Sequence, residues 1–152
     1  MNKKHADILL VEDSLDDAEM TIRALGQVNL ADNLVHFEDG QEVLDYLFGE
    51  GEYVNRDISI QPKAILLDIK MPRVDGIEVL RQIKANESTK MIPVVIMTSS
   101  SEEKDMISAY SFGVNSYVVK PMDFSGFAKA VSELGLYWML TNSIPGNKSP
   151  DE

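Results

Sequence analysis

The chain has 152 residues, 44% of them apolar, which is enough to build one domain with a hydrophobic core. Its 14 basic and 25 acidic side chains give a net charge of −11, so we expect no direct binding to nucleic acid. The absence of cysteine excludes disulfides, thiolate metal sites and cysteine nucleophiles. The polar start and the short apolar runs predict no signal peptide and no membrane insertion, and a cytoplasmic protein is expected.

Short apolar runs alternate with longer amphipathic stretches along the chain. The runs predict strands at residues 8–11, 34–37, 64–67, 93–97 and 117–119. A helix is expected after each strand. The residues that open these helices or precede them are Ser14, the Asp39-Gly40 turn, Asp75-Gly76, Ser101 and Asp123. This alternation predicts an α/β fold in which a doubly wound, five-stranded parallel sheet is covered on both faces.

The two segments outside this alternation are residues 49–62 and the end of the chain. Residues 49–62 are expected to form a long loop. Residues 141–152 are rich in Asn, Ser, Pro and Gly, and we expect them to be a disordered tail. The predicted domain therefore spans residues 1–140.

Polar side chains follow four of the predicted strands. Glu12 and Asp13 follow the first strand, Asp68 the third, Thr98 the fourth and Lys120 the fifth. Ligands of an open parallel sheet bind outside the carboxyl ends of its strands, so these groups are expected to meet. Three clustered carboxylates need a cation, and an all-oxygen ligand set favours Mg²⁺ over Zn²⁺.

The same set of side chains suits a carboxylate that attacks phosphorus. Mg²⁺ and the Lys120 ammonium offset the charge that builds up on the phosphoryl oxygens, and Thr98 can hydrogen-bond one of those oxygens. Each residue also has a plainer explanation: a helix cap for Glu12-Asp13, a solvated loop for Lys120 and a polar loop for Thr98. An acid that ends an apolar run, as Asp68 does, is costly unless it is paired. The joint pattern at matching strand ends favours the phosphoryl site.

These residues lie in stretches that resemble the receiver domains of bacterial two-component response regulators. The matching stretches are residues 9–13, 66–72, 75–76, 97–99 and 117–121, and the resemblance covers about residues 6–140. It implies a flavodoxin-like (βα)5 fold with strand order 2-1-3-4-5. It also implies a phosphoacceptor signalling domain that is not an enzyme but assists its own phosphorylation and dephosphorylation.

The resemblance also implies a role for each metal and phosphoryl ligand. Asp68 is the expected phosphoacceptor, with Lys120 and Thr98 as catalytic partners. Mg²⁺ is expected to bind Asp13 and Asp68 directly, Glu12 through water, and the backbone carbonyl of Lys70.

Two further features are implied near the fifth strand. Thr98 and Tyr117 form the expected switch pair, in which Thr98 moves to the phosphoryl group and Tyr117 turns inward behind it. The Lys120–Pro121 peptide bond is expected to be cis, which would place the ammonium.

A narrower resemblance is to the small response regulators paired with bacterial phytochromes. It rests on Gly51-Glu52-Tyr53 in the long loop, on residues 109–117 and on the terminal stretch 137–140. It implies a histidine kinase, such as a phytochrome, or a phosphotransfer protein as the partner. It also implies a homodimer through the face formed by the fourth helix, the fifth strand and the fifth helix. We expect Phe127 in the core and Trp138 at the interface.

Three other functions agree less well with the sequence than a phosphoacceptor receiver domain does. A haloacid-dehalogenase-like phosphatase needs Asp-x-Asp, but Lys70 stands where the second acid is required. A dinucleotide-binding fold needs a Gly-rich turn after the first strand, and none is present. An adaptor that is never phosphorylated would not need the intact acid set and Lys120. His5 and His36 indicate no metal site.

Overall fold

A computed structural model describes residues 6–145 of the chain. Its five strands form one parallel sheet in the order β2-β1-β3-β4-β5, as predicted. The strands are β1 (Ile8–Val11), β2 (Leu34–Phe37), β3 (Ala64–Leu67), β4 (Val94–Thr98) and β5 (Ser116–Val119). Within these residues, no helix is long and apolar enough to cross a membrane.

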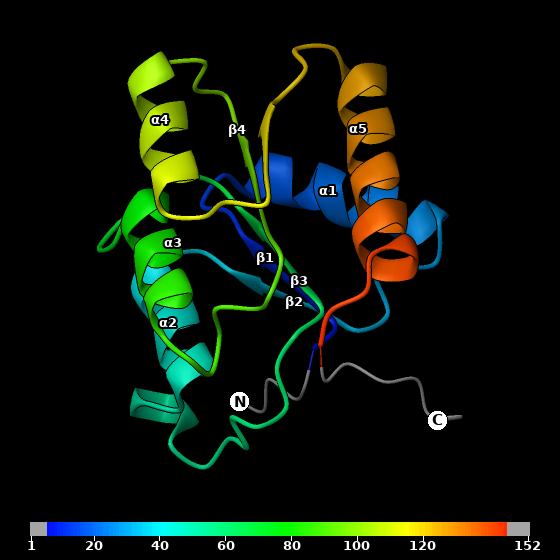
Figure 1. Cartoon of the computed structure of the whole chain (residues 1–152). Helices are drawn as coiled ribbons and strands as arrows, with labels where there is room; N and C mark the ends of the chain where they lie inside the picture. Colours follow the sequence, from blue (N-terminus) through cyan, green and yellow to red (C-terminus); the bar gives the residue numbers. More distant parts are fainter. Residues whose placement is uncertain (1–5, 146–152) are drawn as a thin grey trace.

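Five α-helices cover the two faces of the sheet. They are α1 (Leu15–Gln27), α2 (Gly40–Phe48), α3 (Gly76–Ala85), α4 (Glu103–Ser111) and α5 (Phe124–Leu136). Helices α1 and α5 lie together on one face, and α2, α3 and α4 lie on the other (Figure 1). A short 3₁₀ turn (Gly51–Tyr53) follows α2, and a π-helical turn (Tyr137–Thr141) extends α5.

The two faces of the sheet bury separate apolar clusters. Leu9, Val11 and Leu67 point into the core under α2, α3 and α4, whereas Leu10 and Leu66 point into the core under α1 and α5. Because both faces are covered, β1, β3 and β4 are buried along their whole length, which explains their continuous apolar sequence. Phe127 lies in the second core, as expected, and the half-buried Trp138 packs against it.

The N-termini of four helices are capped by an acidic or hydroxyl side chain. Ser14, Asp39, Asp75 and Asp123 each accept a hydrogen bond from the backbone N–H three residues later. The prediction that Ser101 caps the fourth helix is wrong, because α4 begins one residue later, after Glu102. The Ser100 hydroxyl lies just before this helix, where it accepts from the Glu102 N–H and donates to Asp105.

The strand register places the carboxyl ends of the central strands level with one another. Val11 of β1 pairs with Leu67 of β3, and Leu67 pairs with Ile96 of β4. The residues that follow these strands therefore emerge at one edge of the sheet. Gly76 closes the loop after β3 so tightly that an added Cβ would lie 2.0 Å from the carbonyl oxygen of Asp68.

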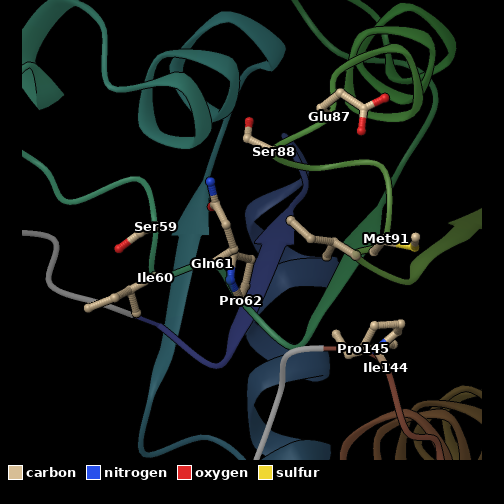
Figure 2. A pocket seen from close by; sticks show the side chains of 10 residues that line it. Ser59, Ile60, Gln61, Pro62, Glu87, Ser88, Met91, Ile144 and Pro145 are labelled. Atoms are coloured by element: carbon tan, nitrogen blue, oxygen red, sulfur yellow. The ribbon is translucent and has the colours of Figure 1, made fainter.

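The long loop after α2 lies toward the end of the molecule that is opposite the carboxyl edge of the sheet. Its Tyr53 ring lies against Phe37 and Tyr46, and Arg56 stacks 3.9 Å over the Tyr46 ring. A hollow of about 470 Å³ lies between the end of this loop, residues 87–92, and Ile144 and Pro145 (Figure 2). It sits near the amino ends of β3 and β4, at the edge of the sheet away from the acidic residues.

The predicted tail lies only partly within the described residues. Thr141 ends the π-helical turn, and Ile144 and Pro145 border the hollow. Residues 146–152 lie outside the described residues, as does His5. The division at residue 140 stays a prediction.

Candidate functional site

The predicted acidic residues come together at the carboxyl edge of the sheet. One carboxylate oxygen each from Glu12, Asp13 and Asp68 lies within 4.8 Å of the others. Glu12 and Asp68 are buried and Asp13 is exposed, so the cluster opens to solvent on the Asp13 side. The strand ends thus deliver the set of oxygens that the sequence predicts.

Lys120 lies at the centre of a network of carboxylates. Its Nζ atom is 2.7 Å from Oε1 of Glu12, 2.7 Å from Oδ2 of Asp17 and 3.2 Å from Oδ2 of Asp68. Its backbone N–H donates to the carbonyl oxygen of Thr98, which continues the pairing of β4 and β5 beyond the last strand residue. Lys120 is therefore fixed at both its backbone and its ammonium.

Sequence reasoning missed Asp17 as a member of this network. The sequence pattern indicates only a helix that begins after Ser14, and it gives Asp17, three positions later, no role at the site. The usable signal was that α1 starts at the same edge of the sheet as the acids, so an acid one turn into the helix lies beside them.

Burial and charge shift the acid–base properties of the network. Burial raises the pKa of Glu12 to about 7; Lys120 acts against this rise and Asp68 adds to it. Burial alone would lower the pKa of Lys120, but its hydrogen bonds to Asp17 and Glu12 outweigh that effect and raise the pKa above its ordinary value. The ammonium is therefore charged at neutral pH.

The Asp68 carboxyl is held at both of its oxygens. Oδ1 accepts a 2.7 Å hydrogen bond from the backbone N–H of Ile69, while Oδ2 faces Lys120. The enclosed space beside Asp68, Glu12 and Thr21 is about 10 Å³, close to the room that one water needs. A larger reactant must therefore reach Asp68 from the solvent side.

The predicted switch residues, Thr98 and Tyr117, meet at the backbone of Ser100. The Thr98 hydroxyl is buried and accepts a 3.3 Å hydrogen bond from the Ser100 N–H. The Tyr117 hydroxyl donates to the Ser100 carbonyl oxygen at 3.0 Å, and burial raises its pKa. The Tyr117 side chain thus points toward the loop between β4 and α4.

Two predictions at the rim of the site have different outcomes. The Lys120–Pro121 peptide bond is trans, so the predicted cis bond is wrong. The ammonium reaches Glu12, Asp17 and Asp68 without the cis isomer, which for X–Pro bonds is less stable by about 0.5–1 kcal/mol. Lys70 lies exposed beyond Asp68, and the role of its carbonyl as a metal ligand stays a prediction.

The donor set fits a hard divalent cation. All three clustered groups offer carboxylate oxygens, the ligands that Mg²⁺ and Mn²⁺ prefer. Lys120 already neutralises part of this acid set. A bound cation would therefore share Glu12 and Asp68 with the ammonium.

Comparison with known proteins assigns this fold and site to one protein family. The family model of the response regulator receiver domain matches residues 8–132. The chain therefore belongs to the response regulator receiver domain family.

Two relatives match this chain over most of the length of both proteins. The chain is 41% identical over 140 residues to the probable methanogenesis regulatory protein FilR2 of Methanothrix harundinacea (91% of this chain, 87% of the relative). It is 38% identical over 138 residues to the response regulator Rcp1 of Synechocystis (91% and 92%).

Solved structures of similar proteins include a phosphorylated and a metal-bound form. The phosphorylated cyanobacterial phytochrome response regulator RcpA matches with a TM-score of 0.85 at 36% identity, over 93% of this chain and 99% of that one. The Mn²⁺-bound form of Rcp1 matches with a TM-score of 0.84 at 37% identity, over 91% and 98%. The chain is thus a close homologue of phytochrome-associated, single-domain response regulators.

Proposed function

We propose that this protein accepts a phosphoryl group on Asp68 from the phosphohistidine of a histidine kinase or phosphotransfer protein. The observation that carries the proposal is the position of the Asp68 carboxyl. It lies 3.2 Å from the Lys120 ammonium and within the Glu12, Asp13 and Asp68 cluster. The similarity to RcpA and Rcp1 supports a kinase of the phytochrome type as the donor.

The transfer step uses the two fixed sides of the carboxyl. An oxygen of Asp68 bonds to phosphorus while the bond from phosphorus to the donor's imidazole nitrogen breaks and its electron pair stays on the ring. Lys120, charged and already next to Asp68, stabilises the negative charge on the phosphoryl oxygens. The hydroxyl of Thr98, at the end of β4, donates a hydrogen bond to another of those oxygens.

The clustered acids would hold the metal. Asp13, Asp68 and the Lys70 carbonyl would bind Mg²⁺, and Glu12 would act through water. When bound, Mg²⁺ supplies positive charge opposite the developing phosphoryl charge. Water that arrives from the solvent side then attacks phosphorus, the bond from phosphorus to the Asp68 oxygen breaks, and inorganic phosphate leaves with the carboxylate restored.

The phosphoryl signal leaves the site through Thr98 and Tyr117. Both side chains bond to the backbone of Ser100, so a movement of Thr98 toward the phosphoryl group changes the loop on which Tyr117 rests. This loop leads into α4. Phosphorylation thereby shifts a two-state equilibrium of the face formed by α4, β5 and α5.

That face supports a homodimer as the output. Its elements expose large apolar side chains, among them Ile107 and Tyr110 of α4, Val119 of β5 and Phe124 of α5. Exposed apolar clusters of this kind mark association surfaces. The net charge of −11 makes direct contact with nucleic acid unfavourable, so the signal passes by protein association or onward phosphotransfer.

Incubation with acetyl phosphate and Mg²⁺, followed by intact-mass measurement, tests the proposal. We expect the wild-type protein to gain the mass of one phosphoryl group and Asp68→Asn to gain none. Asp75→Asn is the matched control near the site, because asparagine caps a helix as well as aspartate does. A wild-type protein without added mass, or full labelling of Asp68→Asn, would contradict the proposal.

A further inference from the structure

The Lys120 ammonium is saturated by three carboxylates, one of which lies outside the acidic cluster. An ammonium has three N–H groups, and Glu12, Asp17 and Asp68 each accept one of them. The contacts to Glu12 and Asp17 are both 2.7 Å, whereas the contact to Asp68 is 3.2 Å. The ammonium is thus anchored on two sides and only loosely bound to Asp68.

Asp17 presents its carboxylate from a fixed position. Its backbone N–H donates to the Ser14 hydroxyl, and its carbonyl oxygen accepts a 2.8 Å hydrogen bond from the Thr21 hydroxyl. Thr21 is buried and borders the small space beside Asp68. Helix α1 therefore holds Asp17 in place relative to the end of β5.

In the proposed function, Glu12 and Asp68 take part in metal binding or phosphoryl transfer, whereas Asp17 has no role in either. Glu12 and Asp68 belong to the group of oxygens that suits a divalent cation, and Asp68 also becomes the acyl phosphate. Asp17 is not a member of that group of oxygens. Of the three partners of Lys120, Asp17 is therefore the one that stays available when the cation and the phosphoryl group are in place.

We propose that Asp17 is a positioning residue, which anchors the Lys120 ammonium so that its third N–H points at the phosphoryl group on Asp68. This inference rests on the proposed function. Lysine has a long, flexible side chain, and a poorly placed ammonium stabilises the phosphoryl charge less well. Asp17 acts through Lys120 and touches no reacting atom.

The rate of labelling by acetyl phosphate and Mg²⁺ in four variants tests this inference. We expect Asp17→Ala to slow labelling by about tenfold, the effect of losing one hydrogen bond between charged groups. Asp16→Ala is the matched control, because Asp16 lies exposed in the same helical turn and its loss changes the net charge and the helix dipole in the same way. It should leave the rate within about twofold.

The Lys120→Met background separates positioning from a merely structural role. If Asp17 acts through Lys120, Asp17→Ala should slow Lys120→Met no further. A tenfold loss in both backgrounds would overturn the inference, as would equal rates for Asp17→Ala and Asp16→Ala. Asp17→Asn serves in place of Asp17→Ala if the latter does not fold.

A second readout keeps the inference independent of phosphorylation. Urea unfolding without Mg²⁺ measures the stability of wild type, Asp17→Ala, Lys120→Met and the double variant. We expect the two single losses not to add, and strict additivity would contradict the contact. If the wild type takes up no phosphoryl group, the proposed function fails, and this stability cycle alone decides whether Asp17 anchors Lys120.

Discussion

The Nζ atom of Lys120 lies 3.2 Å from Oδ2 of Asp68, a contact between residues 52 positions apart in the chain. β4 lies between β3 and β5, so the lysine side chain reaches across the end of that strand. The same ammonium also holds Glu12. A single positive charge therefore organises both the acceptor and part of the metal ligand set.

Replacement of Lys120 should slow phosphorylation but strengthen metal binding. We expect Lys120→Met to slow labelling by acetyl phosphate by about 100-fold, because one charged stabiliser of the phosphoryl oxygens is lost. The variant should nevertheless bind Mg²⁺ more tightly, because the competing cation has gone. Titration calorimetry without a phosphodonor measures this affinity, with Lys129→Met, an exposed lysine of α5, as control. Weaker Mg²⁺ binding by Lys120→Met would contradict the account.

A pair of glycine substitutions tests how the loop after β3 positions Asp68. The added Cβ of Gly76→Ala would lie 2.0 Å from the Asp68 carbonyl oxygen, so the backbone must shift. We expect a loss of at least about 2 kcal/mol in unfolding free energy and slower labelling. Gly26→Ala in α1 would meet only Ala31, at 3.9 Å, and should stabilise by about 0.5 kcal/mol. Equal effects of the two substitutions in urea unfolding would be inconsistent with this close approach.

The apolar face of α4, β5 and α5 should control oligomeric state. We expect sedimentation velocity to show a dimer when a phosphoryl mimic is bound, and Tyr110→Asp to remain monomeric while taking up phosphoryl groups at the wild-type rate. Tyr110 is 59% exposed on α4, so the substitution should leave the fold intact. Leu15→Asp, equally exposed on α1, is the control and should still dimerise. Dimers of Tyr110→Asp would show that another surface is used.

Lys84 should give the protein a distinct pH dependence. Its ammonium donates to the carbonyl oxygens of Lys90 and Ile92 and to Asn115, and burial lowers its pKa to about 8. An unfolded lysine has a pKa of about 10.4, so between these values the unfolded chain binds more protons and stability rises with pH. The wild type should therefore gain stability relative to Lys84→Met from about pH 8 to about pH 10. Urea unfolding of both proteins measures this, and a constant difference would contradict the burial effect.

The strands could be predicted because an unbroken apolar run indicates a strand that is buried on both faces. β1, β3 and β4 are covered on both faces and read as unbroken apolar runs, and the polar residues that follow them mark where each strand ends. Parallel order then places Glu12, Asp13, Asp68, Thr98 and Lys120 on one edge. Most of the site followed from this simple geometry.

The features that were missed depend on contacts between distant residues. Asp17 meets Lys120 across 103 positions, and a sequence read locally assigns it only to a helical turn. Ser101 is a plausible cap by residue type, but α4 begins after Glu102, and Ser100 rather than Ser101 contacts Asp105 of this helix. The Lys120–Pro121 bond is trans, and the ammonium still reaches Glu12, Asp17 and Asp68, an arrangement that no local pattern specifies.

The most direct test of the account is to locate the phosphoryl group at a single residue. Borohydride reduces an acyl phosphate on aspartate to homoserine, and peptide sequencing by mass spectrometry identifies the modified position. We predict homoserine at position 68 after treatment with acetyl phosphate and Mg²⁺, and aspartate there when either reagent is omitted. Homoserine at Asp13 or elsewhere, or unmodified Asp68 in a protein that carries a phosphoryl group, would contradict the central claim.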